Sequence, residues 1–424
     1  MEFYDEHGVH PLPLKNKWCV HAYYTMCPYA PDGSGRILFS GADIKTGKTK
    51  IYIMSSTGEL LDEFGDGLAE SNFYHTGHWQ TWSDDAQYVY YQGGDMINPV
   101  IHCYNIKTGE DISMCGDMEG APPFGNPIIS GYLGMLYAAG YADGHYYAHK
   151  APIPFEQRDK HGLFKFNVKE NKCELALSVN DILKIHPCRE MLMNAEKKYI
   201  EETGNTEGFT LMEYCVRWNA KGDRFLFYFG NHCVDKSRKE PKLTYVFTSD
   251  KDMKNIYMAL DMSFDKFGLH WGWHPDGEHL IGYFSDPDEP QKLCLCSVKY
   301  DGTELKRISK HSSGGHASIC PANYNILVTD EFVADTISTE MYDEKLYKNN
   351  AILPGRVVFI DLTTDTEICS YVLPRVNGTV EPAGRNPLRV CHHPVWSSDG
   401  KKVLVNTLPG ENSVLCQLDF SLIK

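Results

Sequence analysis

The chain has 424 residues, of which 42% are hydrophobic and 23% charged, and its formal net charge is −15. This composition is that of a soluble globular protein, and the acidic balance disfavours a general binder of nucleic acid or of an anionic membrane, which would normally be basic. An anionic small ligand would need positive charge concentrated at one site.

The first residues, Met1 to His7, lack the basic start and apolar stretch of a signal peptide. No run approaches the ~18 apolar residues of a membrane span. The 14 cysteines are scattered, with Cys294 and Cys296 the closest pair. We therefore expect free thiols in a cytoplasmic protein.

One strand–turn–strand unit recurs along the chain. In its clearest copy, Pro394–Val405, an apolar strand ends in the turn Asp399-Gly400 and a second apolar strand follows. Asp-Gly suits such turns because both residues tolerate positive φ. In chain order, the residues at the position of Trp396 are Tyr29, Trp82, Ile129, Trp218, Trp273, Ile319 and Trp396 itself.

Four of the six separations between these anchors are close to the period of propeller blades, about 40–50 residues. A third strand and another turn follow each copy, so each repeat supplies about four strands. In the third copy we expect Met135–Tyr137 as the second strand and Phe164–Phe166 as the third. The sequence predicts an all-β fold, a single seven-bladed β-propeller over residues 1–424. A β-sandwich with coincidental Asp-Gly turns is the alternative, which seven ordered copies disfavour.

The last repeat stops after Val414–Leu418, one strand short. We expect an N-terminal strand, in the run Trp18–Tyr23, to complete that blade and leave the ring without an open edge. The two long separations contain insertions at 173–214 and 333–355, which we place on one face of the ring. A helix is predicted around Glu190–Tyr199, ending before Gly204, and a helical piece around Met341–Leu346.

The start of each innermost strand lies on the face opposite the Asp-Gly turn. Three residues before the anchors stand Met26, Trp79, Asn126, Cys215, His270, His316 and His393. Three consecutive blades thus place a histidine at the same level beside the central channel, which predicts a divalent-metal site with open positions. The alternative is three channel-lining histidines held by water or packed beside Trp271 and Trp396.

The same face receives the loops after the second strands, where sites are usually built. These loops carry His145, Tyr146, His149 and His232, and four arginines are expected near them: Arg189, Arg217, Arg385 and Arg389. Taken singly, His145, His149 and His232 are also explained as turn or surface residues.

Several segments together resemble the oligogalacturonate lyases and their seven-bladed relatives. They are the Trp-Ser-x-Asp-Gly repeats, Leu269–Trp273, Gly315–Ser318 and Arg389–Pro394. The resemblance implies cleavage of uronate-containing oligosaccharides by β-elimination, with a divalent metal held by histidines and a Gln. One departure is that the Gln-x-x-His-x-His ligand run of that family is absent, and the nearest segment is Arg389-Val390-Cys391-His392-His393.

On this hypothesis His270, His316 and His393 bind the metal, which is manganese by resemblance, with zinc as the alternative. The substrate is an anionic oligosaccharide, bound by Arg389, Arg217, Arg189 and Arg385. His232 is the first choice for the base, with His145, Tyr146 and His78 in reserve. Two other functions stay open: a metal-dependent or histidine-dependent glycoside hydrolase, and a non-catalytic TolB-type binding propeller.

Overall fold

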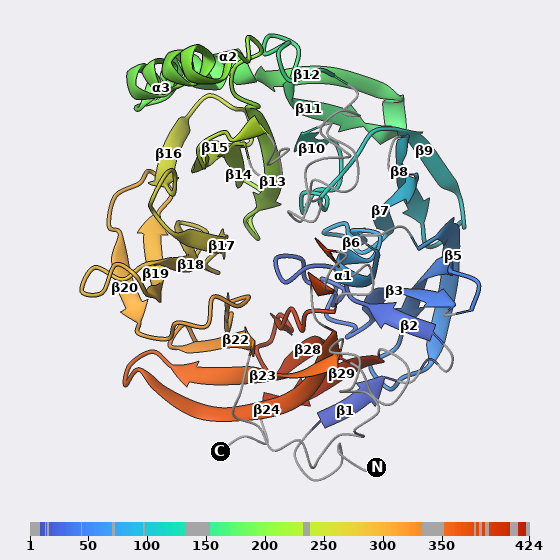
Figure 1. The fold of residues 1–424 in the computed structure, drawn as a ribbon. Helices are drawn as coiled ribbons and strands as arrows, with labels where there is room; N and C mark the ends of the chain where they lie inside the picture. The colour runs from blue at the N-terminus through green and yellow to red at the C-terminus, as the bar shows by residue number, and fades with distance from the viewer. Residues whose placement is uncertain are drawn as a thin grey trace.

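The computed structural model describes residues 9–12, 14, 17–43, 45–69, 73–95, 98–131, 153–231, 238–332, 352–376, 379–380, 384–385, 390–407 and 414–420. Its strands form antiparallel sheets arranged around a common centre, so the fold is the predicted seven-bladed β-propeller (Figure 1). Six of the sheets that the structure describes have four strands, and the third blade has three.

The first two blades are the sheets β2-β3-β4-β5 and β6-β7-β8-β9. Their strands are β2 (Lys17–Val20), β3 (Ile37–Asp43), β4 (Lys48–Met54), β5 (Leu60–Leu68), β6 (Thr81–Trp82), β7 (Tyr88–Gly94), β8 (Pro99–Asn105) and β9 (Asp111–Cys115). The short helix α1 (Phe73–Thr76) connects the two blades.

The third blade consists of β10 (Ile128–Gly131), β11 (Gly162–Asn167) and β12 (Lys172–Ser178), with the 3-10 turn η2 (Val168–Glu170) between the last two strands. Because β10 pairs directly with β11, Phe164–Phe166 occupies the second position in the sheet, and its prediction as a third strand was wrong. Met135–Tyr137, the expected second strand, lies outside the described residues.

The remaining blades are β13-β14-β15-β16, β17-β18-β19-β20, β21-β22-β23-β24 and a last one that contains β27, β28 and β29. Their strands are β13 (Met212–Trp218), β14 (Arg224–Gly230), β15 (Thr244–Asp250), β16 (Ile256–Asp261), β17 (Gly268–Trp273), β18 (His279–Ser285), β19 (Leu293–Lys299), β20 (Lys306–Ser309), β21 (Ser318–Ile319), β22 (Ile326–Phe332), β23 (Ile352–Asp361), β24 (Thr366–Val376), β27 (Val395–Trp396), β28 (Lys402–Thr407) and β29 (Val414–Asp419).

The ring is closed by an N-terminal strand, as expected, but a different one from that predicted. Strand β1 (Val9–Leu12) pairs with β29 and completes the last blade, from Val9 opposite Leu418 to Leu12 opposite Leu415. Trp18–Val20 instead form β2, the innermost strand of the first blade, which pairs with β3. The assignment of Trp18–Tyr23 to the last blade was therefore wrong, because the backbone partners of this run belong to the first blade.

The anchor positions of the repeat hold successive blades together. The indole N–H of Trp82 donates to the carbonyl of Pro28, that of Trp273 to Arg217, and that of Trp396 to Ser318. Each acceptor belongs to the blade before the tryptophan. Seven clusters of buried apolar side chains lie between neighbouring blades, one at each junction of the ring. The core is thus divided among the blade interfaces, as stacked repeats require.

The helix predicted in the first insertion is confirmed. Helix α2 (Val179–Ile185) begins in a capping box between Ser178 and Asp181, and α3 (Arg189–Thr203) ends at Gly204, whose φ is 72°. The first residues of the segment 173–214 belong to strand β12. In the second insertion, residues 333–351 lie outside the described part of the chain, and 352–355 belong to β23.

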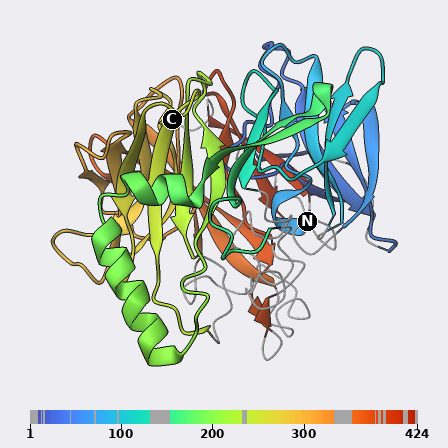
Figure 2. The ribbon, with the colours of Figure 1, turned by 90° about the horizontal axis from the view of Figure 1, so that it is seen from above.

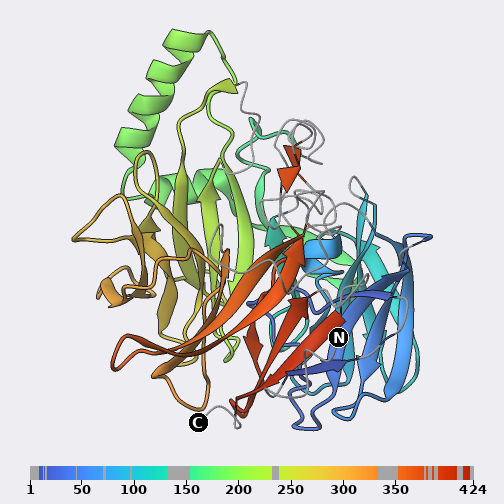
Figure 3. The same ribbon diagram turned by 60° about the horizontal axis from the view of Figure 1, so that its bottom comes forward.

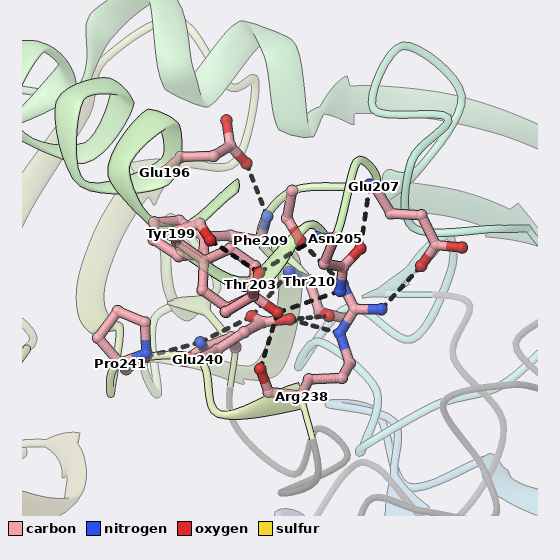
Figure 4. Close-up of polar contacts among 12 residues, drawn as sticks. Glu196, Tyr199, Thr203, Asn205, Glu207, Phe209, Thr210, Arg238, Glu240 and Pro241 are labelled. Carbon is pink, nitrogen blue, oxygen red and sulfur yellow. Dashed lines mark hydrogen bonds and ion pairs between the residues drawn. The ribbon is translucent and has the colours of Figure 1, made fainter. Parts of the chain in front are cut away.

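Helix α3 projects from one face of the ring (Figure 2), the same face on which the hairpin β25 (Thr379–Val380) and β26 (Gly384–Arg385) stands (Figure 3). Polar contacts fasten it to segments next to strands of the fourth blade (Figure 4): Glu196 accepts from the backbone N–H of Phe209 at 2.7 Å, and the hydroxyl of Tyr199 donates to the carbonyl of Arg238 at 2.8 Å. No helix in the described ranges has the length and apolar character needed to cross a membrane.

Candidate active site at the centre of the ring

The positions three residues before the anchors of the repeat often share an unusual backbone conformation. At four of the seven positions three residues before an anchor, a non-glycine residue adopts a left-handed conformation, which is uncommon for such residues. They are Trp79 (φ 53°), Cys215 (φ 56°), His270 (φ 57°) and His393 (φ 46°). In β13 and β17 the residue lies at a register shift between the two inner strands. These four positions are therefore equivalent in the fold as well as in the sequence.

The three predicted histidines come together in a row. The ring centroids of His270 and His316 are 4.2 Å apart, and those of His316 and His393 are 4.3 Å apart. His270 lies on β17, whereas the other two lie just before β21 and β27. His270 is partly exposed, and both His316 and His393 are fully buried.

All three imidazoles are held through the same ring atom. Nδ1 of His270 lies 2.9 and 3.0 Å from the carbonyl oxygens of Gly314 and Gly315. Nδ1 of His316 lies 3.0 Å from a carboxylate oxygen of Asp330, and Nδ1 of His393 lies 3.3 Å from the carbonyl oxygen of Ala22. Because these oxygens accept, we assign the proton of each ring to Nδ1, which leaves Nε2 with its lone pair.

Asp330, on β22, links two members of the row. Its carboxylate accepts from the backbone N–H and from Nδ1 of His316, and from the backbone N–H of His393 at 3.3 Å. Burial would raise the pKa of this carboxyl, but the neighbouring His316, His392 and His393 lower it well below its ordinary value. Asp330 is therefore a buried anion that positions two imidazoles.

A close backbone approach fixes the loop before His316. A Cβ on Gly315 would lie 1.7 Å from the carbonyl oxygen of Asp330, where no side chain fits. Glycine at this position lets the loop reach β22, so that His316 meets the carboxylate of Asp330 while the carbonyl of Gly315 meets His270.

Two tyrosines of the first blade pack against the row. The ring centroid of Tyr23 lies 4.7 Å from that of His393, and the ring centroid of Tyr24 lies 5.0 Å from that of His316. Both follow β2 and are buried. The sequence predicts Tyr23 at the end of an edge strand, so this role was not predicted.

Arg217, predicted to bind substrate, is buried behind these tyrosines. Its guanidinium carbon lies 5.2 to 5.6 Å from the ring centres of Tyr23, Tyr24 and Tyr228. It donates to the hydroxyl of Tyr24 at 3.2 Å and to the carbonyl of Trp271. This cation brings positive charge close to the row, and its Nη1 is engaged by protein.

A second buried ionisable group, Glu119, lies near Arg217. One of its carboxyl oxygens accepts from the backbone N–H of Cys215 at 2.9 Å. Burial raises its pKa to about 8, against the lowering effects of the Cys215 N–H and of Arg217. The sequence pattern does not mark this residue, because it lies outside the repeated unit and no spacing singles it out.

A further histidine extends the row beyond His393. The ring centroid of His75, on α1, lies 4.6 Å from that of His393. His75, Cys391 and His393 each offer a donor atom, and these atoms lie within 4.8 Å of one another. Among the described residues, no other group of three or more His, Cys, Asp or Glu side chains has its donor atoms this close together. The sequence predicted His393 but neither His75 nor Cys391.

The other predicted residues are dispersed. His78 is buried, with Nε2 2.7 Å from the hydroxyl of Thr49, and burial lowers its pKa to about 4. Arg189 is exposed at the start of α3, outside the ring of blades (Figure 1). It lines a cavity of about 480 Å³ with Arg158 and Lys184. Arg385 is described only as part of the backbone of β26, and four residues lie outside the described ranges: His145, Tyr146, His232 and Arg389.

Fold and centre together define a seven-bladed propeller with a row of histidines at its centre. No family model and no curated protein matches the chain. Among solved structures it is similar to an oligogalacturonate lyase from Vibrio parahaemolyticus, with 13% identity and a TM-score of 0.61 over 98% of this chain and 94% of that one.

It is also similar to an oligogalacturonate lyase in complex with manganese, with 13% identity and a TM-score of 0.62 over 99% of this chain and 96% of that one. A third similar structure is prolyl oligopeptidase B from Galerina marginata, with 9% identity and a TM-score of 0.50 over 96% of this chain and 49% of that one. At these identities the comparisons show the fold, and enzymes of different chemistry share it.

Proposed function

We propose that the chain is a carbon–oxygen lyase that cleaves uronate-containing oligosaccharides by metal-assisted β-elimination in the cytoplasm. The observation that carries the proposal is the row of His270, His316 and His393, in which each Nδ1 is held by an oxygen and each Nε2 keeps its lone pair. The similarity to lyase structures, one of them a manganese complex, supports the same reaction.

The residues fit a divalent ion. Imidazoles that bind metals generally donate the other ring N–H to a carbonyl or carboxylate, which fixes the tautomer. The row has this arrangement three times. Nε2 of His316 is buried and has no hydrogen-bond partner among the described residues, as expected of a ligand atom. Manganese is the ion favoured by resemblance, and zinc suits the same imidazoles.

The substrate chemistry explains why such a site is useful. β-Elimination removes the proton on the carbon beside a uronate carboxylate, and negative charge then develops on that carboxylate. A bound divalent ion would supply positive charge that stabilises this developing charge. Arg217 adds a fixed cation near the row, which reconciles an anionic substrate with a chain of net charge −15.

The remaining roles are proposals that rest on the sequence. His232 takes the proton as general base, and His145 and Tyr146 are the reserves. Arg389 and Arg385 bind substrate carboxylates through charge-assisted hydrogen bonds. The structure gives less support to two residues: the ring of His78 is engaged by Thr49, and Arg189 lies at the outside of the ring.

The test is incubation of the purified chain with oligouronides while the ultraviolet absorbance of a new C4=C5 double bond is followed. We expect the absorbance to rise with added divalent metal and to stay low in His316→Ala. Cleavage products without that absorbance would contradict the lyase hypothesis and favour a glycoside hydrolase, since a metal bound by the same histidines can also activate water. If the oligouronides are not cleaved at all, the result favours a non-catalytic binding propeller.

A further inference from the structure

A second cavity lies at the turn end of the fifth blade, beside the sixth. Its volume is about 420 Å³, within the roughly 300–1,000 Å³ of small-molecule sites. It is lined by His274, directly after β17, and by Ile319, on β21. The histidine row lies at the other end of the same strands, because His270 is four residues before His274 on the chain. That spacing is roughly 13 Å in an extended strand, so the cavity is separate from the row.

The repeated turn has an unusual residue at this cavity. In the second blade the hydroxyl of Ser83 donates to the carboxylate of Asp85 at 2.6 Å. In the last blade Ser397 donates to Asp399 in the same way, at 2.7 Å. The fifth blade has His274 at the position of these serines. A serine is enough to hold the turn in the other blades, so the fold itself does not require an imidazole here.

The carboxylate of this turn, Asp276, is satisfied by its own segment. One oxygen accepts from the backbone N–H groups of Glu278 at 2.8 Å and of His279 at 3.0 Å, and the other lies 2.8 Å from Nδ1 of His279. Burial would raise the pKa of Asp276, but these hydrogen bonds lower it below its ordinary value. Donors of the turn therefore balance much of the negative charge next to the cavity.

The ring of His274 offers the cavity a hydrogen-bond donor. The backbone N–H of Asp276 donates to Nδ1 of His274 at 3.1 Å. Burial lowers the pKa of His274, against the raising effect of the Asp276 carboxylate at 3.2 Å. The ring is therefore neutral near pH 7, with its proton on Nε2. No described residue is hydrogen-bonded to Nε2, so this N–H can donate to a ligand.

A cation and a hydroxyl lie side by side in the same cavity. Lys306, on β20, is the direct pairing partner of Ser297, on β19, so the two side chains share one face of the sheet. Lys306 forms no ion pair with a described residue, whereas the neighbouring Lys299 pairs with Glu304. Ser297 is buried, and its hydroxyl has no hydrogen-bond partner in the described ranges. The pair suits a carboxylate, which needs a positive charge and a donor.

An aromatic ring completes the cavity. Tyr324 is 48% exposed, and its ring meets that of His274 edge to face, with centroids 4.8 Å apart. Beside it, Ile308 and Ile319 supply apolar surface. A flat, exposed aromatic face next to polar groups can stack against the C–H face of a sugar ring, while the hydroxyl groups of the sugar meet the polar side chains.

We propose that this cavity is an accessory binding site for an anionic oligosaccharide, in which a uronate ring stacks on Tyr324 and its carboxylate binds Lys306 and Ser297. The inference deepens the proposed function and rests on it for the identity of the sugar. The site binds substrate at the turn end of the fifth blade and takes no part in the reaction at the histidine row.

The experiment measures the reactivity of single lysines in the purified full-length chain. The amines are acetylated with an N-hydroxysuccinimide ester in the presence of a chelator, with and without a galacturonate trimer, and each lysine is followed by mass spectrometry. At a trimer concentration about ten times Kd, we expect acetylation of Lys306 to slow about tenfold, because only the unoccupied site reacts. Lys310 is the matched control, since it is exposed and lies outside the lining of the cavity. Equal protection of the two lysines would overturn the inference.

A variant and a modified ligand test the two halves of the site. In Tyr324→Ala we expect half-protection of Lys306 to need about tenfold more trimer, whereas Tyr324→Phe keeps the ring and the affinity. The methyl-esterified trimer has no charge, so it should need at least about tenfold more than the acid, since charged hydrogen bonds are the stronger ones. Unchanged protection in Tyr324→Ala, or equal protection by the ester, would contradict the proposed contacts.

Lys306→Met tests whether the cavity is separate from the reaction. We expect the initial rate of unsaturated product to equal that of the unaltered chain, and loss of product would overturn the accessory role. The two proposals fail independently. Protection of Lys306 in a chain that forms no unsaturated product contradicts the lyase, whereas unsaturated product without protection contradicts only the accessory site.

Discussion

The two ends of the histidine row differ in what can reach them. His270 is partly exposed, and its Nδ1 is held by loop carbonyls, with Tyr24 beside the ring. At the other end His393 and His75 are buried against Tyr23. Solvent therefore reaches the first end, whereas the second end is closed. The difference places the approach to the row, for the proposed substrate, on the side of His270.

The largest effect is expected where the two ends are joined. In Gly315→Ala the new methyl group would lie 1.7 Å from the carbonyl oxygen of Asp330, so the loop must move away from both His270 and β22. We expect a loss of about 3 kcal/mol in the free energy of unfolding, as for overpacked sites, measured by urea denaturation. Gly272→Ala is the control, because its Cβ would find its nearest contact at 3.4 Å. Equal midpoints for the two variants would contradict the packing argument.

Asp330→Asn tests the middle of the row. The change keeps the shape of the side chain but removes the charge that holds His316 and His393. We expect metal affinity to fall by about 10–100-fold, as when groups behind metal ligands are altered, measured by competition with a chelating dye. Glu331→Gln, a neighbouring carboxylate paired with Arg356, should leave the affinity unchanged. A fall in Glu331→Gln as large as that in Asp330→Asn would show that the effect is not specific to the row.

Glu119→Gln examines the region beyond the His270 end. The pKa of Glu119 is raised from 4.5 to about 8. Between these two pH values the folded chain therefore keeps a proton on Glu119 that the unfolded chain loses. Its stabilising contribution is complete below pH 4.5 and declines as the pH rises toward 8, by at most about 1.4 kcal/mol per pH unit. The variant keeps the bond from Cys215 and should show a shallower decline in urea denaturation between pH 5 and 8. Parallel curves would argue against the buried, protonated carboxyl.

The smallest effect is expected for Tyr24→Phe. This change removes the hydroxyl that accepts from Arg217 at 3.2 Å, while Arg217 keeps its bond to the carbonyl of Trp271. We expect about 1 kcal/mol of destabilisation, typical of one hydrogen bond, measured by thermal unfolding. Tyr257→Phe, at a ring that is 38% exposed, is the control. A much larger loss would mean that Tyr24 positions the His270 end.

The fold could be predicted because the strand–turn–strand unit recurs seven times in the sequence. The anchor tryptophans and Asp-Gly turns fixed the order of the blades, and the offset of three residues found His270, His316 and His393. The closing strand was misassigned because Val9-His10-Pro11-Leu12 contains a proline and lacks apolar alternation, while Trp18–Tyr23 looks more like a strand. Only pairing with Leu415–Leu418 reveals the role of the shorter run.

The site was predictable only where it follows the repeat. His75 escaped notice because it lies on a single helical turn between two blades, and Cys391 because it stands two residues before the register position. Asp330 and Gly315 matter through contacts between loop and strand that no spacing encodes. Glu119 is defined by burial alone. Tertiary contacts between blades, rather than local pattern, bring these residues to the centre.

The pairing of β1 with β29 also joins strands from distant parts of the chain. The last blade gains its fourth strand only when Val9–Leu12 reaches Leu415–Leu418, so closing the ring depends on a highly non-local contact. Such contacts form slowly, because loop closure costs entropy before the contact is made. Without β1, strand β29 would present an unpaired edge to other chains.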